Sequence, residues 1–344
     1  MKCWSLVAAM ALVGCYRKGP PPNTIPTPTP IDAINSEFDD VNASDPGIPY
    51  RSTLIFSTNR ASKGGDFDLW TATLQWSEPE GDAPATISAF APPASLAGSV
   101  NSPQNDRSPI ALVDDDWFGY YGLLAFSSDR DGGKGGFDLY AVPCSRSYYD
   151  DCSPMSAPVP FALNTPADEM YLTRAFAPRT LLFASNRDSV MGGGPAQGPH
   201  DLYLARWPLP TTKNTTAVAQ RDVDLGVKGP DAITNAPAEL HRVDELSSEG
   251  DDTAPFVYKS GDTPEVVFVS DRPGSLGQHD IYCSRFTKGA WSAPKHLDKV
   301  SSASDELRPI VMDINHTRFM LFSSNRPGGK GGYDLYAVGY SGCR

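Results

Sequence analysis

Five short apolar runs along the chain each end in a polar, glycine-rich turn. The runs and their turns read LIFSTNRASKGGDFDLW, LLAFSSDRDGGKGGFDLY, LLFASNRDSVMGGGPAQGPHDLY, VVFVSDRPGSLGQHDIY and MLFSSNRPGGKGGYDLY. Each copy begins with an apolar segment that carries a Phe, passes through the turn and ends in a second short segment with an aromatic residue. This order is typical of two strands joined by a tight connection. The pattern therefore predicts five copies of one β-hairpin.

The five copies share fixed positions around one arginine. These arginines are Arg60, Arg130, Arg187, Arg272 and Arg326. A Phe lies four residues before each arginine, and Ser or Thr lies two residues before it. After each turn comes an aspartate, namely Asp68, Asp138, Asp201, Asp280 and Asp334. Because one guanidinium satisfies several acceptors at a crowded corner, we expect each arginine and aspartate to pair with each other or with turn backbone.

A polar, acidic turn precedes each hairpin. The five turns read NSEFDD, NSPQND, NTPADE, SSEGDD and SSASDE. The carboxylates at equivalent positions are Asp40, Asp106, Glu169, Asp252 and Glu306. Equivalent positions of repeated units form a ring, so one role for these groups is a focused negative field that docks a cation or a basic segment. The other is that each carboxylate accepts backbone N–H bonds of its own turn.

With a strand on either side of the hairpin, each unit holds four strands, which is the blade of a β-propeller. We predict an all-β propeller with five blades. Six blades stay open, because the 85 residues between Arg187 and Arg272 include residues 205–246, which lack the motif and have room for a degenerate blade or an insertion. Few residues follow Tyr336, so the last blade lacks an outer strand. We expect a strand at residues 30–35 to supply it and close the ring.

The repeated core F-x-[ST]-[ND]-R…D-[LI]-[YW], spread over roughly residues 34–340, resembles the WD40-like β-propeller repeats of the TolB type. The resemblance implies a propeller of the periplasm or cell envelope. A separate α/β domain like that of TolB and an OmpA-like peptidoglycan-binding domain are not evident in the sequence. The contacts that the family makes with its partners are therefore not carried over to this chain.

The first fifteen residues predict export. The apolar run from Cys3 to Val13 is too short to span a bilayer and suits the core of a signal peptide over residues 1–14. Leu12-Val13-Gly14-Cys15 resembles the bacterial lipobox, which implies that the Cys15 thiol is lipidated and anchors the chain to a membrane. Residues 15–33 are rich in Pro and read as a semi-rigid tether before a propeller at 34–344.

Composition narrows the class of protein further. Gly and Pro number 30 and 32, which favours turns over long helices, and the net charge of -12 argues against a nucleic-acid binder. Tyr16 stands where an Asp would signal inner-membrane retention, so the outer membrane is favoured, without indicating which side. In an oxidising compartment Cys144 and Cys152 are close enough in sequence to form a disulfide. Cys283 and Cys343 either pair or stay as buried free thiols.

Motifs that carry chemistry are scarce. The sequence shows no GxSxG or HExxH motif and no Cys/His set with zinc spacing, so we expect no catalytic residue, metal or cofactor. His200 and His279 occupy the repeat position held by Phe67, Phe137 and Tyr333, which is typical of a wall residue. We therefore expect a monomeric, non-enzymatic scaffold for an envelope protein or cell-wall glycan. The alternative is a glycoside hydrolase that uses carboxylates near the axis.

Overall fold

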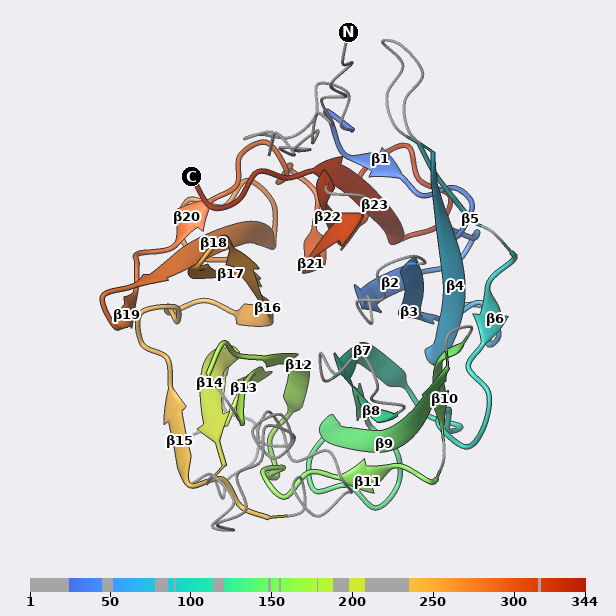
Figure 1. Cartoon of the computed structure of the whole chain (residues 1–344), viewed down its shortest axis with the longest axis horizontal. Helices are drawn as coiled ribbons and strands as arrows, with labels where there is room; N and C mark the ends of the chain where they lie inside the picture. The colour runs from blue at the N-terminus through green and yellow to red at the C-terminus, as the bar shows by residue number, and fades with distance from the viewer. Residues whose placement is uncertain are drawn as a thin grey trace, which may run out of the picture.

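The computed structural model describes residues 25–44, 52–77, 86–89, 91–113, 121–147, 150–154, 156–177, 179–187, 198–207, 235–314 and 317–344. The regular elements in these residues are 23 β-strands, and they form five antiparallel sheets. The sheets stand around a central axis like the blades of a propeller (Figure 1). The predicted all-β propeller with five blades is confirmed.

Each blade runs outward from the axis in chain order. The first blade holds β2 (Asp40–Ser44), β3 (Ser52–Thr58), β4 (Asp68–Ser77) and β5 (Thr86–Ala89), with β6 (Ala94–Ser95) also on β4. The second holds β7 (Asp106–Val113), β8 (Tyr121–Ser128), β9 (Asp138–Ser147) and β10 (Asp150–Pro154), with β11 (Val159–Pro160) also on β9. The third holds β12 (Glu169–Arg174), β13 (Thr180–Ser185), β14 (Asp201–Arg206) and β15 (Glu239–Arg242).

The last two blades follow the same plan. The fourth holds β16 (Asp252–Ser260), β17 (Thr263–Ser270), β18 (Asp280–Thr287) and β19 (Ala290–Trp291), with β20 (Lys295–His296) also on β18. The fifth holds β21 (Glu306–Ile314), β22 (Thr317–Ser324), β23 (Asp334–Gly339) and β1 (Thr29–Pro30). Part of the stretch 205–246 is thus β15, the outer strand of the third blade, while residues 208–234 lie outside the described part of the chain.

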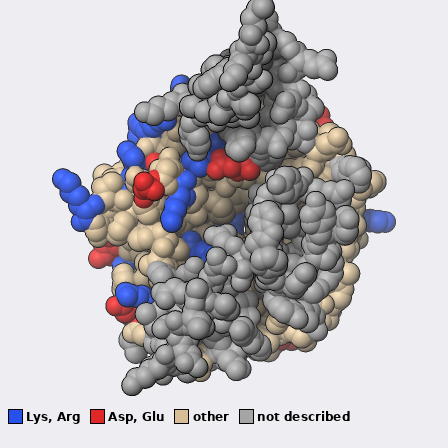
Figure 2. Space-filling view, in the orientation of Figure 1, with Lys and Arg blue, Asp and Glu red and all other residues tan. Residues whose placement is uncertain are grey.

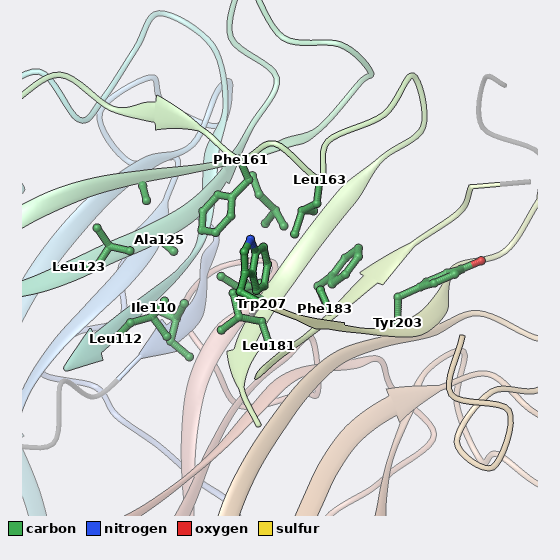
Figure 3. Close-up of a cluster of buried hydrophobic side chains, with 14 residues drawn as sticks. Ile110, Leu112, Leu123, Ala125, Phe161, Leu163, Leu181, Phe183, Tyr203 and Trp207 are labelled. Carbon is green, nitrogen blue, oxygen red and sulfur yellow. The ribbon is translucent and has the colours of Figure 1, made fainter. Parts of the chain in front are cut away.

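The second strand of each blade is buried on both faces, because each blade packs between two neighbours. The strand TLLFAS (β13) is buried at every position, which explains its continuous apolar run. The motif Phe of each blade has no exposed surface. Between the second and third blades, Ala125 lies in one core with Leu181 and Phe183 (Figure 3). Burial between blades, rather than inside one, is what makes the repeats depend on one another.

The start of each inner strand is bonded to the preceding blade. The backbone N–H of Asp106 donates to the carbonyl oxygen of Phe67 at 2.7 Å, and that of Glu169 donates to Phe137 at 2.7 Å. The bond from Asp40 to Tyr333, at 2.8 Å, joins the first blade to the last. The same bond recurs between all five pairs of blades, so it forms a ring around one end of the axis. We call this end the latch end.

The N-terminal segment closes the ring, as predicted. Thr29 is the register partner of Ala337, and the backbone N–H of Ile31 donates to Leu335 at 2.8 Å. The strand covers only Thr29–Pro30 and not the predicted 30–35, because residues 32–34 form a turn. The Asn35 side chain then takes over the pairing, donating to the Leu335 carbonyl at 3.0 Å and accepting its N–H at 2.9 Å. The turn brings the chain back toward the axis, where β2 begins.

Two disulfide positions are visible. Cys283 of β18 and Cys343 form a disulfide across 60 residues, with their Cα atoms 5.7 Å apart. Cys144 is also disulfide-bonded, and the side chain of Cys152, its predicted partner, lies outside the described residues. The Cys144–Cys152 pair stays a prediction.

The described residues contain no helix long and apolar enough to cross a membrane. Figure 2 shows one end of the propeller, with Lys and Arg side chains mainly over the left half, where the fourth blade lies.

The closing strand gives the first prediction. A chain that starts at residue 37 loses the buried side chains of Ile25, Ile31 and Ile34. We expect its free energy of unfolding to fall by about 5 kcal/mol against a chain that starts at residue 24, since each such side chain contributes roughly 1.5–3 kcal/mol. Denaturant unfolding of both chains measures this, and equal midpoints would show that the N-terminal strand does not hold the ring.

Candidate functional site

The motif arginines form the most regular feature of the latch end. In the second blade, the Arg130 guanidinium bonds the Asp106 carboxylate at 2.5 Å and its Nε bonds the Ser128 hydroxyl at 3.0 Å. The guanidinium carbon lies 5.0 Å from the ring centres of both Phe126 and Tyr140. Each of the other four blades repeats this set of contacts around Arg60, Arg187, Arg272 and Arg326. The arginine thus joins both strands of its hairpin to the inner strand.

The five acidic-turn carboxylates are fully buried. Asp106 accepts the Ser102 backbone N–H at 2.6 Å and the Ser102 hydroxyl at 3.0 Å, beside its ion pair with Arg130. Asp40, Glu169, Asp252 and Glu306 make the corresponding contacts, and all five are 0% exposed. Burial raises the pKa of Glu169 and Glu306. These contacts are those of turn caps, and docking would need carboxylates at the surface.

Of the two expected partners for the aspartate after each turn, the structure shows the turn backbone and not the motif arginine. Asp138 accepts the backbone N–H groups of Lys134 at 2.5 Å and Gly135 at 3.2 Å. A Cβ at Gly133 would lie 2.1 Å from the Asp138 carboxylate, so the turn needs glycine there. Asp334 and Asp280 hold their turns in the same way. Asp201 instead forms an ion pair with Arg242. Burial raises the pKa of Asp68. The carboxyl is occupied by turn N–H groups, and the arginine reaches the inner strand instead.

A second polar ring lies just outside the buried one. It consists of the residue before each inner strand, namely Asp39, Asn105, Asp168, Asp251 and Asp305. Each side chain accepts the backbone N–H of the residue before the third strand of the preceding blade, for example Phe137 to Asp168 at 2.8 Å. Asn186 also donates its side-chain amide to Asp168, at 3.3 Å. In the third blade the aspartate thus joins two blades and also binds Asn186 of its own blade.

The fivefold pattern breaks at the fourth and fifth blades. His279 contacts Asp305 through Nδ1 at 3.0 Å and Asp251 through Nε2 at 3.3 Å. His200 Nδ1 contacts the other oxygen of Asp251 at 2.8 Å, and the Tyr333 hydroxyl donates to Asp305 at 2.7 Å. We call these five residues the histidine–aspartate cluster. Histidines at two of five aromatic repeat positions were the signal of this cluster in the sequence, where they were interpreted as wall residues.

Contacts fix the charge of the cluster. Both ring nitrogens of His279 face carboxylate oxygens, so both donate and the ring is an imidazolium. The hydrogen bond that His279 donates to Asp251, followed by the one that it donates to Asp305, raises the pKa of His279 to about 10. Burial acts to raise the pKa of both aspartates, but hydrogen bonds outweigh it and lower both. Those of Asp251 come from His200 and then His279, and those of Asp305 come from His279 and then Tyr333. At neutral pH the centre of the cluster is one cation between two anions.

The cluster is open to solvent at the latch end. The side chains of Asp251 and His279 are 26% and 24% exposed, and that of Asp305 is 10% exposed. A solute can therefore reach the carboxylate of Asp251 directly. Within the described residues no group of three or more His, Cys, Asp or Glu side chains has the arrangement of a metal site. The chemistry available here is that of carboxylates, imidazolium and phenol.

Comparison with known proteins gives structures but no sequence relatives. No family model matches the chain, and neither does any curated protein. A thermostable family-43 glycoside hydrolase is similar with a TM-score of 0.53 and 9% identity over 90% of this chain and 91% of that one. An endo-arabinase from Bacteroides thetaiotaomicron has a TM-score of 0.51 at 10% identity, covering 92% and 97%.

Two further solved structures are similar, and their descriptions name a bound sugar or the type of sugar linkage that the enzyme acts on. The GH43_1 enzyme from Xanthomonas citri complexed with xylotriose has a TM-score of 0.55 at 10% identity, over 91% of this chain and 89% of that chain. The catalytic domain of the Coprinopsis cinerea GH62 alpha-L-arabinofuranosidase has a TM-score of 0.53 at 11% identity, over 93% and 98%. At these identities the likeness shows the fold, which is the five-bladed propeller.

These neighbours correct the functional interpretation of the sequence. The chain was expected to be a non-enzymatic scaffold, and the similar propellers are named as glycoside hydrolases and arabinan-degrading enzymes. That expectation is wrong, and the comparison favours the hydrolase alternative. The sequence argument against an enzyme was the lack of a catalytic motif, whereas the structure brings together a histidine–aspartate cluster that breaks the repeat symmetry.

The buried ion pairs give the second prediction. We expect Asp106→Asn to lower the free energy of unfolding by about 3 kcal/mol or more, because it leaves Arg130 largely buried without its counter-charge. The matched control is Glu239→Gln, which removes the exposed partner of Arg206 and costs less than about 1 kcal/mol. Urea unfolding compares the two, and equal losses would contradict a structural role for the buried pair.

The third prediction concerns pH. Since folding raises the pKa of His279 from 6.5 to about 10, its protonation contributes stability that is complete below pH 6.5 and is lost as pH rises to about 10. We expect the unfolding free energy of the native chain to fall across this window by up to about 1.4 kcal/mol per pH unit. His279→Phe introduces the residue that the first two blades have at this position, and it removes this slope. The control His241→Phe replaces an exposed histidine and keeps the slope. A slope that survives His279→Phe contradicts the assignment.

Proposed function

We propose that this chain is a carbohydrate-active propeller that hydrolyses a glycosidic bond in a glycan bound at the latch end, over the histidine–aspartate cluster. The observation that carries the proposal is the break in fivefold symmetry: Asp251 and Asp305 face each other across His279. The equivalent aspartate or asparagine of the other three blades has no histidine contact within the described residues. The likeness to glycoside hydrolase propellers supports the substrate class.

Two carboxylates lie around one imidazolium in this cluster. The His279 ring contacts Asp305 at 3.0 Å and Asp251 at 3.3 Å. A carboxylate that stays ionised stabilises the positive charge that develops on the sugar or activates a water. Asp251 is the better placed for this role, because it is the more exposed of the two and its lowered pKa keeps it ionised.

The other members of the cluster hold Asp251 in place. His200 and His279 bind its two oxygens, and Asp305 fixes the His279 ring while accepting the Tyr333 hydroxyl. A glycoside hydrolase also needs a proton donor for the leaving group. Neither Asp251 nor Asp305 fills that role, since the pKa of both is lowered, and we assign no donor among the described residues.

The envelope location belongs to the same proposal. The predicted lipobox, with a lipidated Cys15, a Pro-rich tether and the TolB-type repeat, would hold this site beside cell-envelope or extracellular glycans, with the outer membrane favoured. Residues 1–24 lie outside the described part of the chain, so these features stay predictions. The xylotriose complex of a similar propeller makes pentose-containing glycans the first substrates to try.

The fourth prediction tests hydrolysis. We expect the purified chain to release reducing sugar from at least one of arabinan, arabinoxylan and xylan, and Asp251→Asn to lower the rate about a hundredfold or more, as loss of a catalytic carboxylate does. Asn105 occupies the equivalent position in the second blade, so the substitution fits the fold.

The matched control is Asp168→Asn, which makes the same change in the third blade, where the aspartate binds the Phe137 N–H and the Asn186 amide. It should keep full activity. The proposal fails if a broad panel of neutral and acidic glycans gives no turnover, or if Asp168→Asn and Asp251→Asn lose activity equally while both remain folded.

A further inference from the structure

Arg107 is an unpaired guanidinium at the latch end of the axis. It is the second residue of the inner strand β7, and its guanidinium carbon lies 3.8 Å from the ring centre of Phe67 and 6.0 Å from that of Phe137. Its Nε is buried without a hydrogen-bond partner, and within the described residues the guanidinium forms no ion pair. The equivalent residues of the other blades are Val41, Met170, Thr253 and Leu307. The fold therefore does not require an arginine at this position.

Arg308 lies one layer deeper and is also poorly satisfied. It is the third residue of β21 and is 0% exposed. Its Nη2 donates to the backbone oxygens of Leu172 at 3.2 Å and Pro109 at 3.4 Å, while its Nε and Nη1 have no partner. All five motif arginines, by contrast, have a carboxylate. A buried cation without a counter-charge is costly, so a fold that keeps one needs a reason for it.

Tyr171 connects the two arginines. It is the third residue of β12, half-buried, and its ring centre lies 5.8 Å from the Arg308 guanidinium carbon. Tyr171 interacts electrostatically with both Arg107 and Arg308, and burial raises its pKa, so its hydroxyl keeps its proton. Three side chains from three inner strands thus place two positive charges and a hydroxyl around one point of the axis.

The nearby carboxylates do not neutralise Arg107. Asp129 accepts the backbone N–H and side-chain amide of Asn105, at 2.8 and 2.9 Å. Asp39 accepts the Asn59 amide at 3.2 Å and the Tyr333 N–H at 2.9 Å. Both act on Arg107 from a distance, as does Asp66. Because the Phe67 ring covers one face of the guanidinium, its edge donors are left for a group that approaches in its plane.

We propose that Arg107, with Arg308 and Tyr171 beneath it, forms a subsite for the carboxylate of an acidic sugar, a uronic acid unit of the glycan. The planar guanidinium of Arg107 matches a carboxylate in two parallel hydrogen bonds. Arg308 is fully buried, so it acts on the bound carboxylate through its electrostatic field, which is strong where water is excluded. This inference rests on the proposed function for the glycan, and it narrows the substrate class to acidic glycans.

Calorimetry with matched ligands tests the subsite. The probes are trigalacturonate and xylotriose carrying one glucuronate, each compared with its methyl ester, which keeps the sugar and removes the charge. We expect the native chain to bind at least one acid about tenfold or more tightly than its ester, as loss of a charged hydrogen bond predicts. Arg107→Met, with the residue found in the third blade, should abolish this preference and leave ester binding unchanged.

Two further variants separate field from contact. Arg308→Asn, with the residue and left-handed backbone found at Asn42, should weaken acid binding while leaving ester binding unchanged. Lys299→Met removes an exposed positive charge and should change neither. Equal affinity for acid and ester in both pairs overturns the subsite. Binding of added sulfate without any preference for the acids over their esters also overturns it, because that result would indicate a site for a small inorganic anion only.

The outcomes also distinguish this inference from the proposed function. Hydrolysis of neutral glycans with no preference for acids overturns the subsite alone. A preference for acids that depends on Arg107, without hydrolysis of any glycan, supports the subsite and contradicts the proposed hydrolase activity. If the chain shows no preference for acids and hydrolyses no glycan, both proposals are overturned.

Discussion

The buried ion pair between a motif arginine and an inner-strand carboxylate is the interaction on which the rest of this propeller depends. Each arginine lies between two aromatic rings of its hairpin and binds a carboxylate that also caps the acidic turn. One side chain therefore connects three strands and the turn that leads into the blade. Because the pair is buried, each partner needs the other, so all the motif positions must be present together.

This ion pair also determines where a functional site is able to form. The pairs occupy the buried ring, and the residues just outside them join successive blades through backbone N–H groups. At this second ring, side chains such as those of Asp251 and His279 are partly exposed to solvent. Substitution of histidine for the aromatic residue at two positions there links Asp251 and Asp305, with little change in the scaffold beneath. Repeat regularity stabilises the ring, and local departures from it produce the chemistry.

The sequence was sufficient for the architecture, because the motif repeats in every blade and the acidic turns mark the start of every inner strand. It also indicated the closing strand, since the last hairpin has no outer partner of its own. The sequence did not indicate which carboxylate pairs with each motif arginine. The partner of Arg60 is Asp40, which lies 20 residues upstream, whereas Asp68 is nearer along the chain. The site was missed for a related reason. His279 looked like a wall residue, and its contact with Asp305 of the fifth blade arises only when two blades pack together.

The most direct test of the account is a crystal structure of Asp251→Asn soaked with the glycan that the native chain degrades fastest. The account predicts sugar at the latch end, with the glycosidic bond over residue 251 and His279 and the remainder of the chain extending toward Arg107. Sugar bound only on the opposite end, or on the outer rim of the blades, would contradict it.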